Sequence, residues 1–304
     1  MDSYYSLNRY LRETFGVKLY KLALNGGMTC PNRDGRLGSQ GCIFCSRGGS
    51  GDFAASASLP ISEQIEAAKR LIARKTPVDA RYIAYFQAYT NTYAPVSRLR
   101  ALFTEALRHP DIAVLSIATR PDCLPPEILS LLAELNREKP VWVELGLQSI
   151  HPATQRYIGS GFTTADYDRA VQDLHAAGLA VITHVILGLP GETPDDLAAT
   201  ILHIGRLGTD GVKLQLLHVL RNTRLAEEYQ RDRLSVLSLE EYIDLLILCL
   251  EMLPPRTVIH RITGDGPKSL LLAPLWSADK HRVLQAIQQA LSQRQVRQGS
   301  HWAG

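Results

Sequence analysis

Apolar and polar residues alternate along this chain in two ways, as short apolar runs and as longer segments with one apolar face. The runs, such as 113–118 and 181–187, contain few polar residues, which is typical of parallel strands covered on both faces. The pattern predicts strands at 18–24, 82–87, 112–118, 141–147, 179–187 and 211–217, with helices at 63–75, 97–108, 125–138, 164–177 and 194–205. Such a series of βα units predicts an α/β fold, an open or complete barrel whose active site lies at the carboxyl ends of its strands.

Further segments flank this repeat. A helix is predicted at 4–15, and helices at 222–231, 239–252 and 279–295 follow the repeat together with a strand at 257–262. Ser62 is expected to cap helix 63–75, and the last ten residues, which are polar, are expected to fray. Without a break in composition, we expect a core over 1–221, including a loop at 26–50, and an extension over 222–304 that packs on the core without forming a second domain.

A glycine-rich loop carries three of the five cysteines. Cys30, Cys42 and Cys45 have the spacing C-x11-C-x2-C, with Phe44 beside the last. A structural zinc site normally has four ligands, whereas a catalytic centre keeps one position open. Thiolates are also the usual ligands of iron–sulfur clusters, and a cluster with three cysteines leaves one iron available to a small molecule. The loop therefore predicts a metal centre with a vacancy, and a structural zinc knuckle remains the alternative.

Polar residues gather where the predicted strands end. The segments in question are 85–92, 119–123, 144–149, 184–192 and 213–218. Because the carboxyl ends of parallel strands meet at one rim, their coincidence favours a ligand site. Individual residues also have simpler interpretations: Glu144 as an ion-paired buried carboxylate, His184 as a hydrogen-bonded core histidine, and Gly188 as a turn glycine.

Two more features have open interpretations. Cys123 follows a strand end, and it either faces the pocket with a catalytic role or packs in the core. Segment 261–268 follows the last predicted strand and contains Arg261 and Lys268, which can hold an anionic group of a substrate. The alternative for this segment is a solvated turn.

Composition narrows the class of protein. Of the 304 residues, 45% are apolar and 21% are charged, which is ordinary for a globular enzyme. The net charge of +3 permits a polyanionic partner without requiring one. The clustered cysteines do not resemble a disulfide framework, so we expect a reducing, cytoplasmic location. We expect no membrane association, because no apolar run approaches the length of a membrane span and the first residues do not resemble a signal peptide.

With these features the sequence resembles the radical SAM (S-adenosylmethionine) superfamily, and within it the YtqA/YhcC-like branch, which has an Elp3-like radical SAM domain. The resemblance covers about residues 5 to 290 and rests on the long cysteine spacing ending in Cys-Ile-Phe-Cys and on four strand endings. These endings are Tyr-Phe-Gln-Ala-Tyr-Thr-Asn-Thr, Thr-Arg-Pro-Asp-Cys, Glu-Leu-Gly-Leu-Gln-Ser and His-Val-Ile-Leu-Gly-Leu-Pro-Gly-Glu. The resemblance implies a partial (β/α)6-type TIM barrel.

The resemblance also implies roles for individual residues. Cys30, Cys42 and Cys45 would bind three irons of a [4Fe–4S] cluster, and the fourth iron would take the amine and carboxylate of S-adenosylmethionine. Backbone carbonyls around Phe86, Gln87 and Ala88 would meet the methionyl amine, and Glu144 and Gln148 would contact the amino-acid part or the ribose. The adenine would lie among Phe44, Ile186, Gly188, Leu217, His218 and Val219.

The implied reaction is reductive cleavage of S-adenosylmethionine to a 5′-deoxyadenosyl radical that removes a hydrogen atom from a substrate. A flavodoxin- or ferredoxin-type reductant would supply the electron. Members of this branch are implicated in converting the tRNA wobble uridine 5-carboxymethylaminomethyl-(2-thio)uridine to its 5-aminomethyl form, and Arg261 or Lys268 would then hold the substrate carboxylate. Two alternatives stay open: a radical SAM enzyme acting on a small metabolite, and a non-catalytic cluster- or haem-binding carrier of the same fold.

Overall fold

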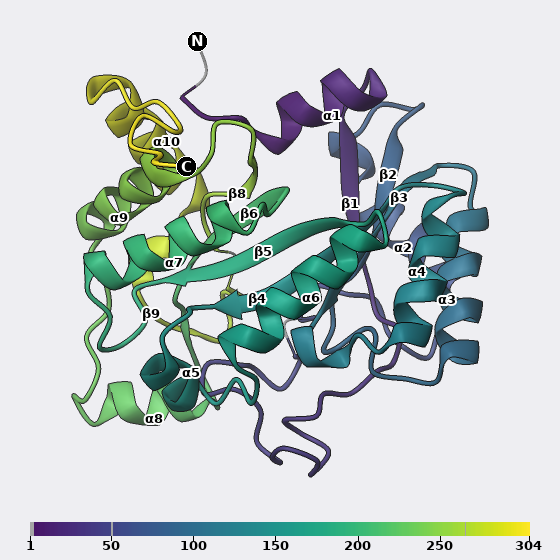
Figure 1. Cartoon of the computed structure of the whole chain (residues 1–304), viewed down its shortest axis with the longest axis horizontal. Coiled ribbons are helices and arrows are strands. Elements are labelled where there is room, and N and C mark those ends of the chain that lie inside the picture. Colours follow the sequence, from purple (N-terminus) through teal and green to yellow (C-terminus); the bar gives the residue numbers. More distant parts are fainter. Residues whose placement is uncertain (1–2, 50, 265) are drawn as a thin grey trace.

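Seven parallel strands form one curled, open sheet in the computed structural model, which describes residues 3–49, 51–264 and 266–304 (Figure 1). The strands follow each other in chain order across the sheet. They are β1 (Leu19–Leu24), β2 (Arg81–Phe86), β3 (Ile112–Thr119), β4 (Val141–Gln148), β5 (Ala180–Leu187), β6 (Gly211–Leu216) and β8 (Val258–Arg261). The predicted partial barrel is confirmed, and the segment after residue 221 contributes β8 as a strand of the sheet.

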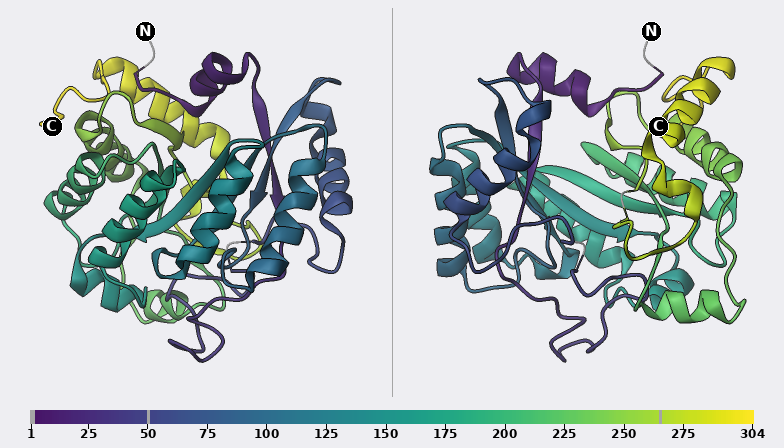
Figure 2. Two further views of the ribbon diagram at one scale, coloured as in Figure 1. Left: turned by 45° about the vertical axis from the view of Figure 1, so that its right-hand side comes forward. Right: turned by 180° about the vertical axis from the view of Figure 1, so that it is seen from behind.

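Helices cover the outer face of this sheet (Figure 2). They are α2 (Ile61–Ile72), α3 (Val96–Arg108), α4 (Pro126–Asn136), α6 (Thr164–Ala176), α7 (Pro194–Arg206) and α9 (Leu239–Met252), with α10 (Lys280–Gln293) packed on α9. By contrast, α1 (Leu7–Phe15) covers the end of the barrel where the strands begin, and its Tyr10 ring lies 6.0 Å from the ring of Trp142. No helix among the described residues is both long enough and apolar enough to cross a bilayer.

Several short elements complete the fold. They are α5 (Pro152–Ile158), α8 (Arg224–Gln230), the antiparallel pair β7 (Val219–Leu220) and β9 (Leu271–Ala273), and 3₁₀ turns at Ala73–Lys75, Pro121–Cys123 and Leu275–Ala278. The sequence pattern did not predict α5, β7 or β9, because elements of two to seven residues are too short to show a clear period.

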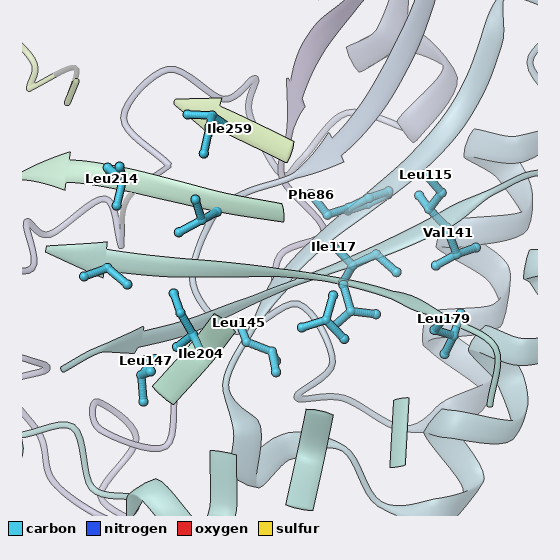
Figure 3. Packing of buried hydrophobic residues seen from close by; sticks show 14 of the residues in the cluster. Phe86, Leu115, Ile117, Val141, Leu145, Leu147, Leu179, Ile204, Leu214 and Ile259 are labelled. Atoms are coloured by element: carbon cyan, nitrogen blue, oxygen red, sulfur yellow. The ribbon is translucent and has the colours of Figure 1, made fainter. Parts of the chain in front are cut away.

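The main hydrophobic core lies between the sheet and the outer helices (Figure 3). Phe86 and Ile117, register partners on β2 and β3, point into this layer, and the Phe86 ring meets that of Phe103 on α3 at 5.0 Å in an edge-to-face arrangement. Because side chains alternate along a strand, the neighbours Tyr85 and Ser116 face the inside of the barrel instead. The inner face is therefore polar where the outer face is apolar.

Two local expectations were wrong. Ser62 does not cap α2, because the helix begins at Ile61 after Pro60 and the backbone N–H of Ser62 donates to the Glu105 carboxylate at 2.8 Å. The C-terminal residues do not fray either. The Gln298 side chain accepts from the backbone of Tyr5 at 2.8 Å and donates to two carbonyls, and Trp302 packs closely against Gly205.

Truncating Phe103 to alanine tests the outer layer. The side chain is fully buried, so Phe103→Ala should lower the free energy of unfolding by about 3–5 kcal/mol. Leu71→Ala on the neighbouring α2 is the control, because that side chain is 83% exposed, and its effect should stay within about 0.5 kcal/mol. Urea unfolding followed by circular dichroism measures both, and equal losses would contradict this packing.

Candidate active site

The loop between β1 and α2 brings three thiols to the carboxyl ends of the strands. Cys30, Cys42 and Cys45 line one pocket of about 270 Å³. A turn in which the backbone N–H of Cys45 donates to the Cys42 carbonyl at 3.0 Å sets the last two side by side. The Arg33 guanidinium donates to the carbonyls of Cys45 and Ser46 at 3.1 and 2.6 Å, which fixes the far end of the turn. The loop is therefore held by its own polar groups.

A buried asparagine ties this loop to the barrel. The Asn32 side-chain amide donates to Cys42 Sγ at 3.4 Å and to the carbonyls of Gly159 and Ser160 at 2.8 and 3.1 Å. Arg120, which follows β3, donates to the same Ser160 carbonyl at 2.7 Å. Sequence reasoning had assigned no role to Asn32 or Arg120, and their positions within the cysteine loop and the Thr-Arg-Pro-Asp-Cys segment were the available signals.

The thiols fit a cationic metal group. Burial, together with the neighbouring Cys45, raises the pKa of the Cys42 thiol to about 11, and burial also raises the pKa of Cys45. A bound metal reverses this effect, because it stabilises thiolates directly. Within the described residues no three His, Cys, Asp or Glu side chains converge on a single metal ion. The three thiols line a shared space, in which each could hold one iron of a cluster.

An unpaired acceptor in the same pocket fits a second ligand. Gln148, at the end of β4, has a left-handed backbone with φ of 69°, and its buried Oε1 has no hydrogen-bond partner among the residues that the structure describes. A buried polar atom without a partner is costly, so a ligand donor at this point would be favoured. Gln87 also lines the pocket.

One wall of the pocket is apolar. Phe44, Ile186 and Leu217 line it and pack in one hydrophobic cluster with Ile158. This wall can take the face of an aromatic ring. His218 lines the pocket beside them, and its ring interacts with the Ser277 hydroxyl at 3.1 Å.

The floor of the pocket is an ion-pair network around Glu144, which is completely buried. Its Oε1 accepts from Lys21 at 2.9 Å and from Ser116 at 2.7 Å, and its Oε2 contacts His184 at 2.7 Å and the Lys213 ammonium. Lys21 comes from β1 and Lys213 from β6, so the network spans the sheet. Glu144 is therefore an ion-paired carboxylate and His184 a hydrogen-bonded histidine. Both also line the thiol pocket, and the contact of Glu144 with S-adenosylmethionine stays a prediction.

Other residues singled out from the sequence lie outside the pocket lining. The Phe86 side chain is in the outer core and its carbonyl accepts from Asn91 at 3.1 Å, while Cys123 lines a separate cavity beside α4 and α6. Burial and the adjacent Asp122 raise the pKa of Cys123 to about 12. Ala88, Gly188 and Val219 are not among the lining residues.

Arg261 and Lys268 belong to a second cavity, at the gap between the sheet edges β1 and β8. Arg261 also lines the thiol pocket, so it stands where the two cavities meet. Lys268 lines the second cavity but not the thiol pocket. Asp265, in the same segment, lies outside the described residues.

The half-barrel and its rim of thiols define an α/β enzyme of the kind that binds an iron–sulfur cluster and a small ligand at the carboxyl ends of its strands. Residues 32–204 match the family model "Radical SAM superfamily", and residues 209–293 match "Radical_SAM C-terminal domain". The chain belongs to the radical SAM superfamily, and it is an enzyme that uses a [4Fe–4S] cluster and S-adenosylmethionine.

Relatives place it further. The chain is 44% identical to YtqA of Bacillus subtilis over 97% of its own length and 92% of that protein, and 37% identical to YhcC of Escherichia coli over 95% and 92%. A "tRNA uridine(34) acetyltransferase" of Methanocaldococcus jannaschii is 28% identical over 55% of this chain and 31% of that protein. The structure of archaeal Elp3 from Methanocaldococcus infernus has a similar fold, with a TM-score of 0.69 and 17% identity, covering 92% of this chain and 64% of that one.

The buried histidine of the floor predicts a dependence of stability on pH. Burial, together with the nearby Lys213, lowers the pKa of His184 from 6.5 to about 4. The unfolded chain therefore binds more protons between these values, so stability present above pH 6.5 is lost as the pH falls toward 4.

His184→Gln removes this titration and keeps a donor for Glu144. Between pH 7.5 and 5.5, urea unfolding should show a loss for the wild type that exceeds that of the variant by roughly 1 kcal/mol. His281→Gln, on the exposed start of α10, is the control and should follow the wild type. Identical pH profiles for wild type and His184→Gln would show that His184 does not titrate in this range.

Proposed function

We propose that this enzyme modifies a tRNA wobble uridine, converting 5-carboxymethylaminomethyl-(2-thio)uridine to the 5-aminomethyl form. The reaction would require removal of a hydrogen atom from the carboxymethyl carbon beside the side-chain nitrogen and loss of one further electron, which would return to the cluster. The resulting imine would be hydrolysed by water to the aminomethyl nucleoside and glyoxylate, while S-adenosylmethionine would end as methionine and 5′-deoxyadenosine. The similarity to a tRNA uridine(34) acetyltransferase supports a tRNA substrate. The observation that carries the proposal is the charge of the second cavity.

That cavity leads from the thiol pocket to the surface between the edges of the sheet. The two cavities adjoin, because they share the lining residues Asp52, Phe53, Tyr85, Gln87, Arg261, Gly266 and Pro267. Among the described residues, five lysines and arginines line the second cavity against two aspartates, Asp52 and Asp279. The basic residues are Lys21, Arg261, Lys268, Lys280 and Arg282. A basic entrance fits the phosphates of a nucleic acid. Phe53, 56% exposed at this point, offers a surface on which a base can stack.

The residues of the thiol pocket then have the following proposed roles. Cys30, Cys42 and Cys45 hold the cluster through three irons. Phe44, Ile186 and Leu217 form the wall for the adenine, while Gln148 accepts a hydrogen bond from the nucleoside or amino-acid part of S-adenosylmethionine. The bound cofactors supply one-electron cleavage of the sulfonium and removal of a substrate hydrogen. The chain orients these groups and excludes water, and a flavodoxin- or ferredoxin-type protein delivers the electron.

Cysteine substitutions test the cluster assignment. Replacing Cys30, Cys42 or Cys45 with alanine should abolish cluster binding and 5′-deoxyadenosine formation, while the far-ultraviolet circular dichroism spectrum is retained. The control is Cys249→Ala, because Cys249 is buried in α9 and does not line the thiol pocket. Iron analysis after anaerobic reconstitution gives the result, and a full iron content in any of the three loop variants would contradict the assignment.

The substrate is tested with tRNA from a strain that lacks this gene. Reconstituted enzyme, S-adenosylmethionine and a reductant should convert its carboxymethylaminomethyl nucleoside to the aminomethyl nucleoside, as measured by mass spectrometry of digested tRNA. Unchanged wobble uridines would overturn the proposal, and a small metabolite would become the better substrate class.

The basic entrance makes a separate prediction about binding. Replacing Lys268 and Arg282 with glutamine should flatten the dependence of log affinity on log salt by about 0.7 for each phosphate that the protein no longer neutralises. Arg70→Gln on the outer helix α2 is the matched control, since Arg70 is exposed on the opposite layer of the fold, and it should leave the slope unchanged. Filter binding over a salt series measures the slopes, and equal slopes in all variants would remove this surface from the tRNA interface.

A further inference from the structure

The floor of the pocket holds two ammonium groups around one carboxylate. Lys21 and Lys213 both pair with Glu144, and both ammonium groups lie over the ring of Tyr85, at 4.8 and 4.4 Å from its centre. Lys213 also donates to the Tyr85 hydroxyl at 3.0 Å. The carboxylate is fully buried, and the Lys213 side chain is only 3% exposed. Such a set places two positive charges around one negative charge, with only Lys21 partly exposed to water.

The hydrogen bonds at this site are unequally distributed. Glu144 already accepts from four groups, two on each oxygen, so its capacity is used. An ammonium has three N–H groups, and the Lys21 ammonium donates one of them to Glu144. The Lys21 side chain is 24% exposed. The lysines can therefore donate to one more hydrogen-bond acceptor, whereas the Glu144 carboxylate has no lone pair left for another donor.

Among the described residues, the titratable groups on the neighbouring strands do not neutralise the excess charge. Asp52 lines both cavities and accepts a hydrogen bond from the Ser46 hydroxyl at 2.9 Å. His184 on β5 and His260 on β8 have pKa values lowered by burial and are uncharged at neutral pH, and Tyr85 on β2 has a raised pKa and is also uncharged. Arg261 on β8 also lines the thiol pocket. Burial, with repulsion from Lys21 and Arg261, lowers the pKa of Lys213. An anion bound here would offset both the burial and the repulsion.

We propose that Lys21 and Lys213 bind a carboxylate carried by the substrate. Glu144 is then a positioning residue, because its two oxygens hold the two ammonium groups where both can reach that carboxylate. Lys21 lines the basic entrance and Lys213 lines the thiol pocket, so the pair stands where the two cavities join. This inference rests on the proposed function, in which the substrate group is carboxymethylaminomethyl. It assigns the substrate carboxylate to two lysines that sequence reasoning had not selected, in place of Arg261 or Lys268.

The location agrees with this role. The two lysines and Glu144 lie within their strands, before the strand ends that carry Gln87 and Gln148. A carboxylate bound at this depth would leave the adjoining carbon and nitrogen on the side of the thiol pocket. Tyr85, held under both ammonium groups, keeps their orientation.

S-adenosylmethionine also carries a carboxylate, so the experiment must separate the two sources. Three proteins are compared: wild type, Lys21→Met and Lys21→Arg. Lys21 is chosen because it is partly exposed, and its loss leaves Lys213 paired with Glu144. Each reconstituted protein is measured for affinity to tRNA with the carboxymethylaminomethyl nucleoside, to tRNA with the aminomethyl nucleoside, and to S-adenosylmethionine.

Wild type should bind the carboxylate-bearing tRNA more tightly than the aminomethyl tRNA by about tenfold or more, because only the former can form the hydrogen-bonded charge pair with the lysines. Lys21→Met should lose this preference, with unchanged affinity for S-adenosylmethionine, and Lys21→Arg should keep most of it. Equal weakening of both tRNAs, weakening for S-adenosylmethionine alone, or an unaltered preference in Lys21→Met would each overturn the assignment.

A second arm does not depend on tRNA. Iminodiacetate, which carries the carboxymethylamine group without a nucleoside, should raise the melting temperature of the wild type and not that of Lys21→Met. If this rise is seen while wild type leaves all tRNA nucleosides unchanged, the carboxylate site stands and the proposed tRNA function fails. If tRNA is converted but neither the rise nor the tRNA preference depends on Lys21, the function stands and this inference fails.

Discussion

The buried carboxylate of Glu144 is the constraint on which the interior of this barrel depends. An open sheet of seven strands has no hydrogen bonds between its first and last strands to fix its curvature. Glu144 stands on the central strand and joins side chains from β1, β3, β5 and β6. Removing one partner of a buried ion pair leaves an uncompensated charge, which is costly, so the network ties strands that do not neighbour one another. The same polar floor closes the lower side of the pocket that the cysteine loop covers.

Much of the fold was predictable because it depends on local patterns. Uninterrupted apolar strands and amphipathic helices located the βα units to within one to three residues, and the helix over 239–252 was predicted with its observed bounds. The prediction that Ser62 caps the helix was wrong because the helix begins one residue before Ser62, after Pro60, and the Ser62 N–H donates to Glu105. Glu105 lies on another helix, so this partner could not be seen in the local sequence. The frayed tail failed for a related reason: the partners of Gln298 and Trp302 are distant in the sequence and leave no local signal.

The grouping of the three cysteines at one pocket was predictable from the sequence, whereas the residues that support this pocket were less so. Cysteine spacing is a local feature, and the apolar wall around Phe44 followed from the family resemblance. Lys21 and Lys213, in contrast, are single polar residues in strands that otherwise read as ordinary, and only the curvature of the sheet brings them to one carboxylate. Asn32 was missed for the same reason, since the carbonyls to which its side chain donates lie more than a hundred residues away in the sequence. Residues that act by meeting distant partners are the ones that a single sequence conceals.

The contacts of the first residues with the last strand have a consequence for the order in which the chain folds. Ser6 forms a bridge with Ile259, the backbone N–H of Ile259 donates to the Tyr5 carbonyl at 2.8 Å, and Tyr5 is bonded to Gln298, 293 positions away. Such non-local pairings form slowly, because a long loop must close before they contribute. During synthesis β1 to β6 can assemble from neighbours, but the end of the barrel beneath Trp142 stays incomplete until β8 and the tail have been made. The interval between these events is when the edge of β6 is open to pairing with another chain.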